Sequence, residues 1–270
     1  MVLNESTYFS QEASREFMSV SQFKRFQECE AAAMAELTGE YSPEQGRALL
    51  LGSYLDEMLT GTKESQEQFI EENRTELFKR NGDPYADVAQ ANEAIKRVQS
   101  QPLMMKCLSG QHQVIMTGEI EGVPFKIKMD SYQPGEFIVD LKFLKSLRSP
   151  NLFENVIDYW KYTTQMAVYQ EIVRQNTGER LPCYIVAVTK ETPARVTVCE
   201  IDQFTLDNEL DVVKRLAPHY QKIKNGEVEP ERCEAYDCDY CAQTSLLVAP
   251  VPYETIAMSA SQIKAMRGEI

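Results

Sequence analysis

Residues 113–146 constrain the fold more than any other part of the chain, because apolar and polar side chains alternate along them. Alternation rich in β-branched and aromatic residues is typical of strands with one buried face. Turn-forming residues interrupt the run at 121–122 and at 133–135. The pattern therefore predicts a meander of about three strands joined by tight turns.

Helical periodicity dominates on both sides of this meander. We expect helices over 19–37, 47–61 and 86–100, a helical stretch with a loop over 62–84, a long helix over 155–178, strands over 183–190 and 194–201, and a helix over 206–227 that Pro218 can interrupt. Ser19 or Ser21 can cap the first helix, and Gly61 ends the second. This order predicts an α/β (α+β) fold, a mixed central sheet flanked by helices.

The length of 270 residues allows a substantial hydrophobic core. We interpret the chain as a single domain over 1–270, with an N-terminal helical part at about 17–100 and a cysteine-rich segment at about 231–242. A content of 43% hydrophobic and 26% charged residues is ordinary for a globular protein, and no run reaches the roughly 20 apolar residues of a membrane helix.

Charge and cysteine usage narrow the class of protein further. A net charge of −13 argues against a broad, non-specific coat on nucleic acid, although a local basic channel remains compatible with it. Seven cysteines, an odd number, and a polar, acidic N-terminus argue against a secreted disulfide framework. We therefore expect a cytoplasmic protein with reduced thiols and no membrane association.

Two aspartates and a lysine, Asp130, Asp140 and Lys142, stand within the meander. Alternate residues of a strand share a face, so Asp140 and Lys142 should point together while Leu141 faces the core. Asp130 is expected to end the preceding strand, where a hairpin can bring it beside Asp140. Two carboxylates and the backbone carbonyl of Leu141 would form an all-oxygen site suited to Mg²⁺ or Mn²⁺.

A lysine beside such a site can orient or deprotonate a water molecule and stabilise charge that develops on a phosphate, while the metal lowers the pKa of that water. For this short motif alone, the alternative is a pair of solvated hairpin charges with a cross-strand salt bridge.

The ordered combination of residues resembles the PD-(D/E)xK nuclease superfamily. It is most similar to the branch with RecB-type nuclease domains, lambda-type exonuclease and the RecE-like exonuclease VIII proteins of prophages. In that branch an acidic residue precedes (D/E)-x-K on the next strand, as Asp130 precedes Asp140 and Lys142 here. The following helix carries Q-x-x-x-Y, matched by Gln165 and Tyr169, and this spacing puts both on one face.

The resemblance covers about residues 17–242. It implies a restriction-endonuclease-like core and a Mg²⁺- or Mn²⁺-dependent deoxyribonuclease, an exonuclease serving phage-type recombination or DNA repair. The implied catalytic residues are Asp130, Asp140, Lys142, Gln165 and Tyr169. It also implies DNA as substrate, a phage-type single-strand annealing protein as partner, and homo-oligomers.

The helix expected at 47–61 departs from the family pattern. The branch often has G-x-x-x-H there, with the histidine near the metal, whereas this chain has Gly52 followed by Asp56. Aspartate is a sound ligand for a hard cation, so the implied metal ligands are Asp56, Asp130, Asp140 and the Leu141 carbonyl. The alternative for Asp56 is a surface acid.

Three cysteines lie close together as C-x4-C-x2-C, at positions 233, 238 and 241. Three thiolates need a fourth ligand for a closed zinc site or an iron–sulfur cluster. The resemblance to AddB-type and some CRISPR-associated nucleases implies Cys29 as that ligand, together with Cys233, Cys238 and Cys241, around a [4Fe–4S] cluster or, alternatively, Zn²⁺. Reduced cysteines in a loose tail are the other interpretation.

Basic and aromatic residues gather in sequence around the predicted site and could line a path for DNA. They are Lys24, Arg25, Lys126, Lys128, Lys142, Lys145, Arg148 and Lys161, with Tyr159, Trp160 and Tyr162. Taken one at a time, most of these lysines are better explained by solubility.

Two other classes of function stay open at this stage. A catalytically inactive DNA-binding or scaffold protein could keep the nuclease fold, and the acidic net charge and the missing histidine favour it. An interaction protein organised by zinc or a cluster would rest on the cysteine segment alone.

Overall fold

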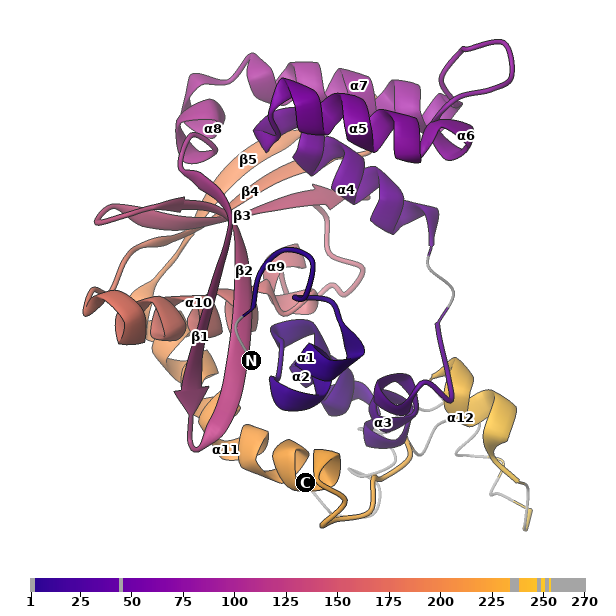
Figure 1. Ribbon diagram of the computed structural model, residues 1–270, viewed down its shortest axis with the longest axis vertical. Helices are drawn as coiled ribbons and strands as arrows, with labels where there is room; N and C mark the ends of the chain where they lie inside the picture. The colour runs from indigo at the N-terminus through magenta and orange to yellow at the C-terminus, as the bar shows by residue number, and fades with distance from the viewer. Residues whose placement is uncertain (1–2, 44–45, 234–237, 247–248, 251–252, 254–270) are drawn as a thin grey trace. The chain divides into compact units, whose positions relative to one another are not determined.

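The central feature is one mixed sheet of five strands in the order β1-β2-β3-β4-β5 (Figure 1). The strands are β1 (Gln111–Ile120), β2 (Val123–Gln133), β3 (Phe137–Leu144), β4 (Cys183–Thr189) and β5 (Val196–Ile201). Strands β2 and β3 pair antiparallel, β3 and β4 parallel, and β4 and β5 antiparallel. The predicted α+β class and mixed sheet are confirmed.

This computed structural model describes residues 3–43, 46–233, 238–246, 249–250 and 253. The chain forms two compact units. The first comprises Met1–Glu44, Glu119–Phe125 and Lys214–Ile270, and the second Gln45–Gly118 and Lys126–Val213. The expectation of a single domain stays a prediction.

The helices of the second unit cover the sheet. They are α4 (Arg47–Thr60), α5 (Lys63–Glu72), α6 (Arg74–Leu77), α7 (Ala86–Gln99), α8 (Pro102–Cys107), α9 (Val156–Tyr159), α10 (Tyr162–Thr177) and the first half of α11 (Gln203–Lys224). Residues of α4 and α7 form one apolar cluster with Val139, Leu141, Val186 and Val188. Helix α10 packs against β3 and β4 and lies across the sheet from α4 and α7 in Figure 1.

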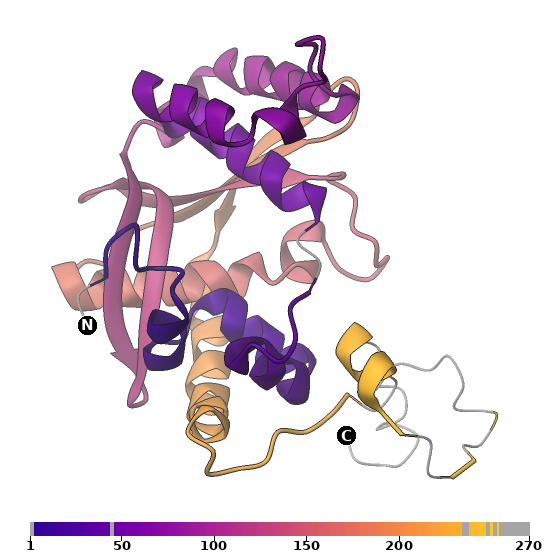
Figure 2. The same cartoon turned by 45° about the vertical axis from the view of Figure 1, so that its right-hand side comes forward.

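The parallel pairing of β3 with β4 explains the position of α9 and α10. Parallel neighbours cannot be joined by a tight turn, so the chain must cross over between them. The antiparallel connections are short by contrast. Glu121 and Gly122 form the two-residue turn of the β1–β2 hairpin, which Figure 2 shows. Their φ angles of 49° and 74° are both positive, as a tight two-residue hairpin turn requires.

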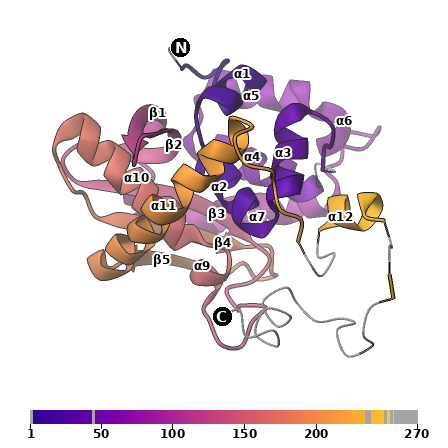
Figure 3. The ribbon, with the colours of Figure 1, turned by 90° about the horizontal axis from the view of Figure 1, so that it is seen from below.

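The first unit contains α1 (Gln11–Glu16), α2 (Val20–Glu28), α3 (Glu30–Thr38), the end of α11 and α12 (Asp239–Thr244). Phe23 and Phe26 of α2 pack on the ring of Tyr220 of α11, with centroids 5.4 and 5.3 Å apart. Figure 3 shows α2 beside α11. Lys224 adds hydrogen bonds to the Phe17 carbonyl and to Gln22, at 3.2 and 3.0 Å.

Two helices expected to be continuous are each divided. The helix expected over 19–37 breaks at Cys29, whose backbone is extended (φ −163°, ψ 112°). The helix expected over 155–178 breaks before Tyr162, because Asn155 caps a four-residue turn and Lys161 adopts a left-handed conformation. Conversely, α11 continues through Pro218, and α8 lies where no helix was expected.

The other expected elements are present within a few residues of their predicted ends. Ser19 caps α2 and Gly61 ends α4. Among the helices that the structure describes, none is long and apolar enough to cross a lipid bilayer.

Candidate active site

Asp130 and Asp140 lie on adjacent antiparallel strands. In the register of β2 and β3, Ser131 lies opposite Val139, and Asp130 and Asp140 are the next residues along the two strands. Asp130 Oδ2 accepts a hydrogen bond from the backbone N–H of Leu141 at 2.8 Å. Asp130 is inside β2, which runs on to Gln133, so the expectation that it ends the strand is wrong, although the expected proximity to β3 is correct.

Asp140 is buried, with 2% of the residue exposed. Its Oδ1 accepts a hydrogen bond from Gln165 Nε2 at 2.5 Å, and its Oδ2 lies 2.5 Å from the ammonium of Lys142. Within the described residues, Oδ2 nevertheless receives no hydrogen bond of acceptable geometry. A buried carboxylate requires a positive charge beside it, and the Lys142 ammonium supplies that charge here.

Lys142 lies beside Asp140 as the strand alternation predicts, while Leu141 packs into the apolar cluster on the other face. Burial alone would lower the pKa of Lys142, but the charges of Asp140 and Asp130 outweigh it, so the pKa is raised. The ammonium also lies over the ring of Tyr162, 4.7 Å from its centroid. Lys142 is therefore held as a cation in this arrangement.

Gln165 and Tyr169 lie on one face of α10, four residues apart, and both point to the strands. Gln165 Nε2 lies within hydrogen-bond distance of the Tyr169 hydroxyl, at 3.1 Å, as well as of Asp140. The Tyr169 hydroxyl donates to the carbonyl of Lys128 on β2 at 2.9 Å. This chain of contacts ties α10 to both aspartate-bearing strands.

Asp56 lies on α4 and belongs to the same group of charges. Burial raises its pKa to about 6, a hydrogen bond from Thr60 lowers it, and the Asp140 charge raises it. The pKa of Asp130 is raised well above its ordinary value, by burial first and then by the charges of Asp140 and Asp56. The three carboxylates thus share one electrostatic environment.

Gln113 is a site residue that the sequence did not reveal. Its Nε2 donates to Asp56 Oδ2 at 2.7 Å, and its backbone φ is 53°, a conformation that costs free energy in a residue other than glycine. Next to it, His112 Nδ1 lies 3.3 Å from the backbone carbonyl oxygen of Asp130. No spacing rule joins position 113 to position 56, so only the folded chain identifies the contact.

The donors around Asp140 fit a hard divalent cation, since carboxylate and carbonyl oxygens are what Mg²⁺ and Mn²⁺ prefer. The three aspartates are not drawn into one tight cage, however. Among the described residues, the one group of three or more acidic, histidine or cysteine side chains gathered closely enough to enclose a metal is the set of four cysteines. The metal site predicted from Asp56, Asp130, Asp140 and the Leu141 carbonyl stays a prediction.

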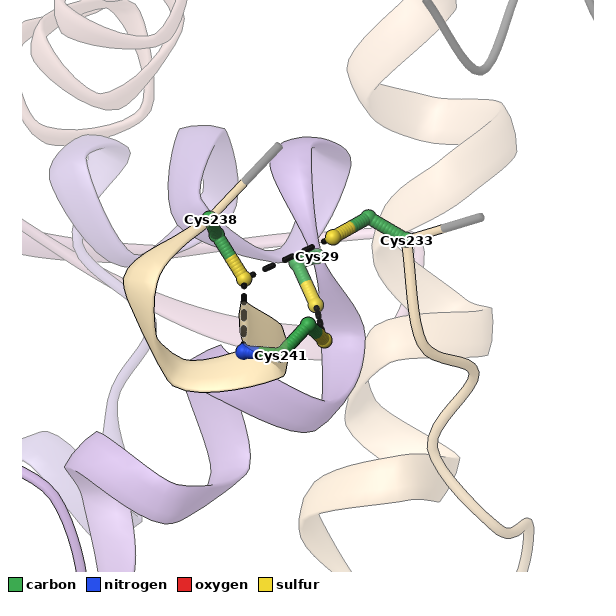
Figure 4. Close-up of side chains that lie close together, drawn as sticks. All are labelled: Cys29, Cys233, Cys238 and Cys241. Atoms are coloured by element: carbon green, nitrogen blue, oxygen red, sulfur yellow. Dashed lines mark hydrogen bonds between the residues drawn. The ribbon is translucent and has the colours of Figure 1, made fainter. Parts of the chain in front are cut away.

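The four predicted cysteines do come together. Cys29, Cys233, Cys238 and Cys241 place their sulfurs within 4.8 Å of one another (Figure 4). This group belongs to the first compact unit, whereas the aspartates belong to the second. The arrangement can hold a metal, and it replaces the interpretation of a loose tail.

The prediction that Lys126 lines an open path for DNA is wrong. Lys126 is 3% exposed, and burial lowers its pKa to about 8. Lys145, Arg148, Tyr159 and Trp160 are exposed, and their contact with DNA stays a prediction.

Residues 19–244 match a protein family described as "PDDEXK-like domain of unknown function (DUF3799)". A crystal structure described as "Putative exonuclease" from Eubacterium rectale shares 40% identity with this chain, covers 100% of both chains and superimposes with a TM-score of 0.85.

A second solved structure, of SSO0001, shares 16% identity over 76% of this chain and 96% of the other. Its TM-score of 0.32 is too low to support a structural argument. No curated protein is significantly similar to this chain.

Proposed function

This chain belongs to the PDDEXK-like family DUF3799, and from that premise we propose that it is a Mg²⁺- or Mn²⁺-dependent deoxyribonuclease that hydrolyses phosphodiester bonds. The observation that carries the proposal is the state of Asp140. It is buried, its Oδ1 accepts a hydrogen bond from Gln165, and its Oδ2 forms an ion pair with the ammonium of Lys142.

Asp130 and Asp140, with the Leu141 carbonyl, are the proposed metal ligands, and Asp56 supports them from α4. When bound, the metal would polarise the phosphoryl oxygen and lower the pKa of a water molecule. The raised pKa values of Asp56 and Asp130 are consistent with this role, because mutually repelling buried carboxylates gain from a cation.

Lys142 is proposed to act as a cation that stabilises negative charge on the phosphate and orients the attacking water. The ion pair of Lys142 with Asp140 supports this role; deprotonation of the water by Lys142 is the alternative. A fixed positive group in an enclosed site needs no reorganisation when charge develops during the reaction.

Gln165 and Tyr169 are proposed to position the reacting groups. Gln165 holds the carboxylate of Asp140, and Tyr169 holds the backbone of β2 at Lys128. The proposed effect on DNA is therefore indirect for Tyr169, which is only 7% exposed.

The finer features of the function are part of the proposal. We propose exonuclease action on DNA in phage-type recombination or repair, in the cytoplasm, with a single-strand annealing protein as partner and a homo-oligomer as the active form. The description of the Eubacterium rectale protein as a "Putative exonuclease" supports the first of these; the others rest on the resemblance of the sequence motifs.

The test is the degradation of linear duplex and single-stranded DNA, with and without Mg²⁺ or Mn²⁺, by the full chain and by two variants. Asp140→Asn should reduce the rate at least about 100-fold, since loss of groups that merely support metal ligands already costs about 10–100-fold. Lys142→Met should reduce it by about 10²–10³-fold, the effect of removing one preorganised charge-stabilising donor.

The matched controls are Asp207→Asn and Lys96→Met, which alter exposed ion pairs with Arg180 and Glu93 and should retain activity. Thermal unfolding with and without Mg²⁺ separates misfolding from loss of the metal ligand, because the ion should stabilise the wild type, Lys142→Met and the controls but not Asp140→Asn. If the wild type is as inactive as Asp140→Asn on both substrates but still binds DNA, the chain is a nuclease-fold scaffold and the proposal is wrong.

A further inference from the structure

Four cysteines from three separate segments converge in the first compact unit. Cys29 lies between α2 and α3, Cys233 follows α11, and Cys238 and Cys241 lie at the start of α12. The Sγ atoms of Cys29 and Cys241 are 3.5 Å apart, as are those of Cys233 and Cys238. Figure 4 shows the four side chains directed toward a common centre.

The spacing of the sulfurs identifies the kind of metal that fits. A tetrahedral ion with Zn–S bonds of ~2.3 Å separates its four sulfurs by about 3.8 Å from one another. All four Sγ atoms here lie within 4.8 Å of one another, which encloses a single ion. In a [4Fe–4S] cluster each thiolate binds a different iron, and the four irons and four sulfides occupy the space between the cysteines, so the cysteine sulfurs must lie farther apart than they do here.

We propose that Cys29, Cys233, Cys238 and Cys241 bind one Zn²⁺ in a closed tetrahedral site. This assignment favours zinc over the iron–sulfur cluster that the sequence resemblance implies. It also differs from a pair of disulfides, because the sulfur separations of 3.5 Å are well above a disulfide bond length of about 2.05 Å, and all four residues are free thiols.

Groups around the cysteines are suited to compensate the charge of four thiolates. The backbone N–H of Cys241 donates to Cys238 Sγ at 3.4 Å, and Arg232 Nη1 lies 3.9 Å from Cys241 Sγ. Cys29 and Cys238 are the N-cap residues of α3 and α12, where backbone N–H groups point outward and favour negative charge.

The zinc ion would join the segment around α12 to the junction of α2 and α3. Among the described residues, two hydrogen bonds and one ring contact also join these segments. Ala31 N–H donates to the Glu231 carbonyl and Glu231 N–H donates to Glu30, both at 2.9 Å, and the rings of Tyr41 and Tyr240 have centroids 5.5 Å apart. Cys29 and Cys241 are 3% and 0% exposed, so a bound ion would be shielded on that side. All four positions of a tetrahedral ion would be filled by protein, as in structural sites.

The experiment is metal analysis of the untagged full-length chain, purified without oxygen and dialysed, by plasma mass spectrometry together with a labile-sulfide assay. We expect about one zinc per chain, no stoichiometric iron and no sulfide. Replacement by Co²⁺ should give the visible absorption of a tetrahedral tetrathiolate site. About four iron and four sulfide per chain would overturn the proposal, and so would a chain that retains no metal.

Cys238→Ser is the informative variant, because serine is a favourable N-cap for α12 but a poor zinc ligand. It should lose the bound zinc, and its thermal midpoint should no longer respond to a zinc chelator. Cys199→Ser, a half-buried cysteine of β5 outside the group, should keep both properties. Retention of one zinc per chain in Cys238→Ser would contradict the assigned ligands. None of these measurements depends on nuclease activity.

Discussion

At the scale of single residues, the candidate site is organised by side chains that hold other side chains. Gln165 holds Asp140, Tyr169 holds the backbone at Lys128, and Gln113 holds Asp56. Such supporting contacts orient the groups that bind a metal, and their loss shows up as weaker metal binding. Gln113 is the most informative of them because its backbone is itself strained, with φ of 53°.

Replacing Gln113 with alanine should raise the Mg²⁺ concentration required for half-maximal DNA degradation by about 10-fold, within the 10–100-fold range for supporting residues. The reason is that Asp56 loses the donor to its Oδ2. Activity at saturating Mg²⁺ should fall much less than the apparent affinity. The measurement is a Mg²⁺ titration of the initial rate.

Gln90→Ala provides the control for Gln113→Ala. Gln90 also makes a side-chain hydrogen bond, to Thr192 at 3.1 Å, but lies on the exposed side of α7. Its Mg²⁺ titration should match the wild type. Equal titrations for Gln113→Ala and Gln90→Ala would show that Gln113 has no positioning role.

At the scale of elements, helix ends explain much of the agreement between expectation and structure. Gly178 ends α10 in a left-handed conformation, with φ of 82°, which glycine adopts without steric cost. Gly52 is different, because it lies inside α4. A methyl group added at either glycine would meet nothing within 4 Å, so backbone preference alone decides the effect of alanine at these two sites.

The two substitutions should therefore have opposite signs. Gly178→Ala should lower the free energy of unfolding by about 1 kcal/mol, the cost of a left-handed residue with a Cβ atom. Gly52→Ala should raise it by about 0.5–1 kcal/mol, the helix-propensity difference between alanine and glycine. Urea unfolding followed by circular dichroism measures both. A shift of the two midpoints in the same direction would mean that hidden packing, rather than backbone conformation, controls these sites.

At the scale of the whole molecule, stability at neutral pH is reduced by the candidate site. Burial raises the pKa of Asp56 to about 6 and that of Asp130 well above its ordinary value. When the pKa of an acid is higher in the folded chain than in the unfolded chain, its protonated form favours folding. This stabilisation is complete below the unfolded pKa, near 4, and is lost as the pH rises through the folded pKa. The relevant window for Asp56 is thus about pH 4 to 7.

Asp56→Asn should therefore be more stable than the wild type at pH 7.5 in magnesium-free buffer, by on the order of 2 kcal/mol, and the difference should disappear near pH 4. Calorimetric melting across this range measures the effect, without a chelator so that thiolate-bound metal is retained. Mg²⁺ should remove the advantage of the variant at pH 7.5.

The exposed substitution Asp207→Asn is the control for this pH dependence, and it should follow the wild type. Parallel melting profiles for Asp56→Asn and the wild type would show that Asp56 titrates normally in the folded chain, contrary to the burial described above.

The fold and the centre of the candidate site were accessible from local patterns. Alternation over 113–146, turn residues at both hairpins and glycine at helix ends are each sufficient to predict an element, because they depend on neighbours within a few residues. The same holds for Lys142 beside Asp140, two residues apart on a strand, and for Gln165 and Tyr169, four apart on a helix. The confirmed mixed sheet follows from the order of these elements.

Local patterns were insufficient where a distant contact decided the backbone. Periodicity predicted continuous helices through Cys29 and Lys161, but Cys29 is extended beside Cys241, and an asparagine-capped turn ends before Lys161. An amphipathic pattern reports which face is buried and carries no information about a break that a tertiary contact imposes.

By itself, then, the sequence predicted most of the strands and helices, the pairing of Asp140 with Lys142, and the group of Cys233, Cys238 and Cys241, since each depends on residue type and short spacing. The tertiary structure alone decided the hydrogen bond from Gln113 to Asp56, the placement of Asp130 and Asp140 around Lys142, and the close approach of the four sulfurs. The physical reason is that burial, charge and separation are properties of groups brought together across the chain: Cys29 and Cys241 are 212 positions apart in sequence and 3.5 Å apart in space.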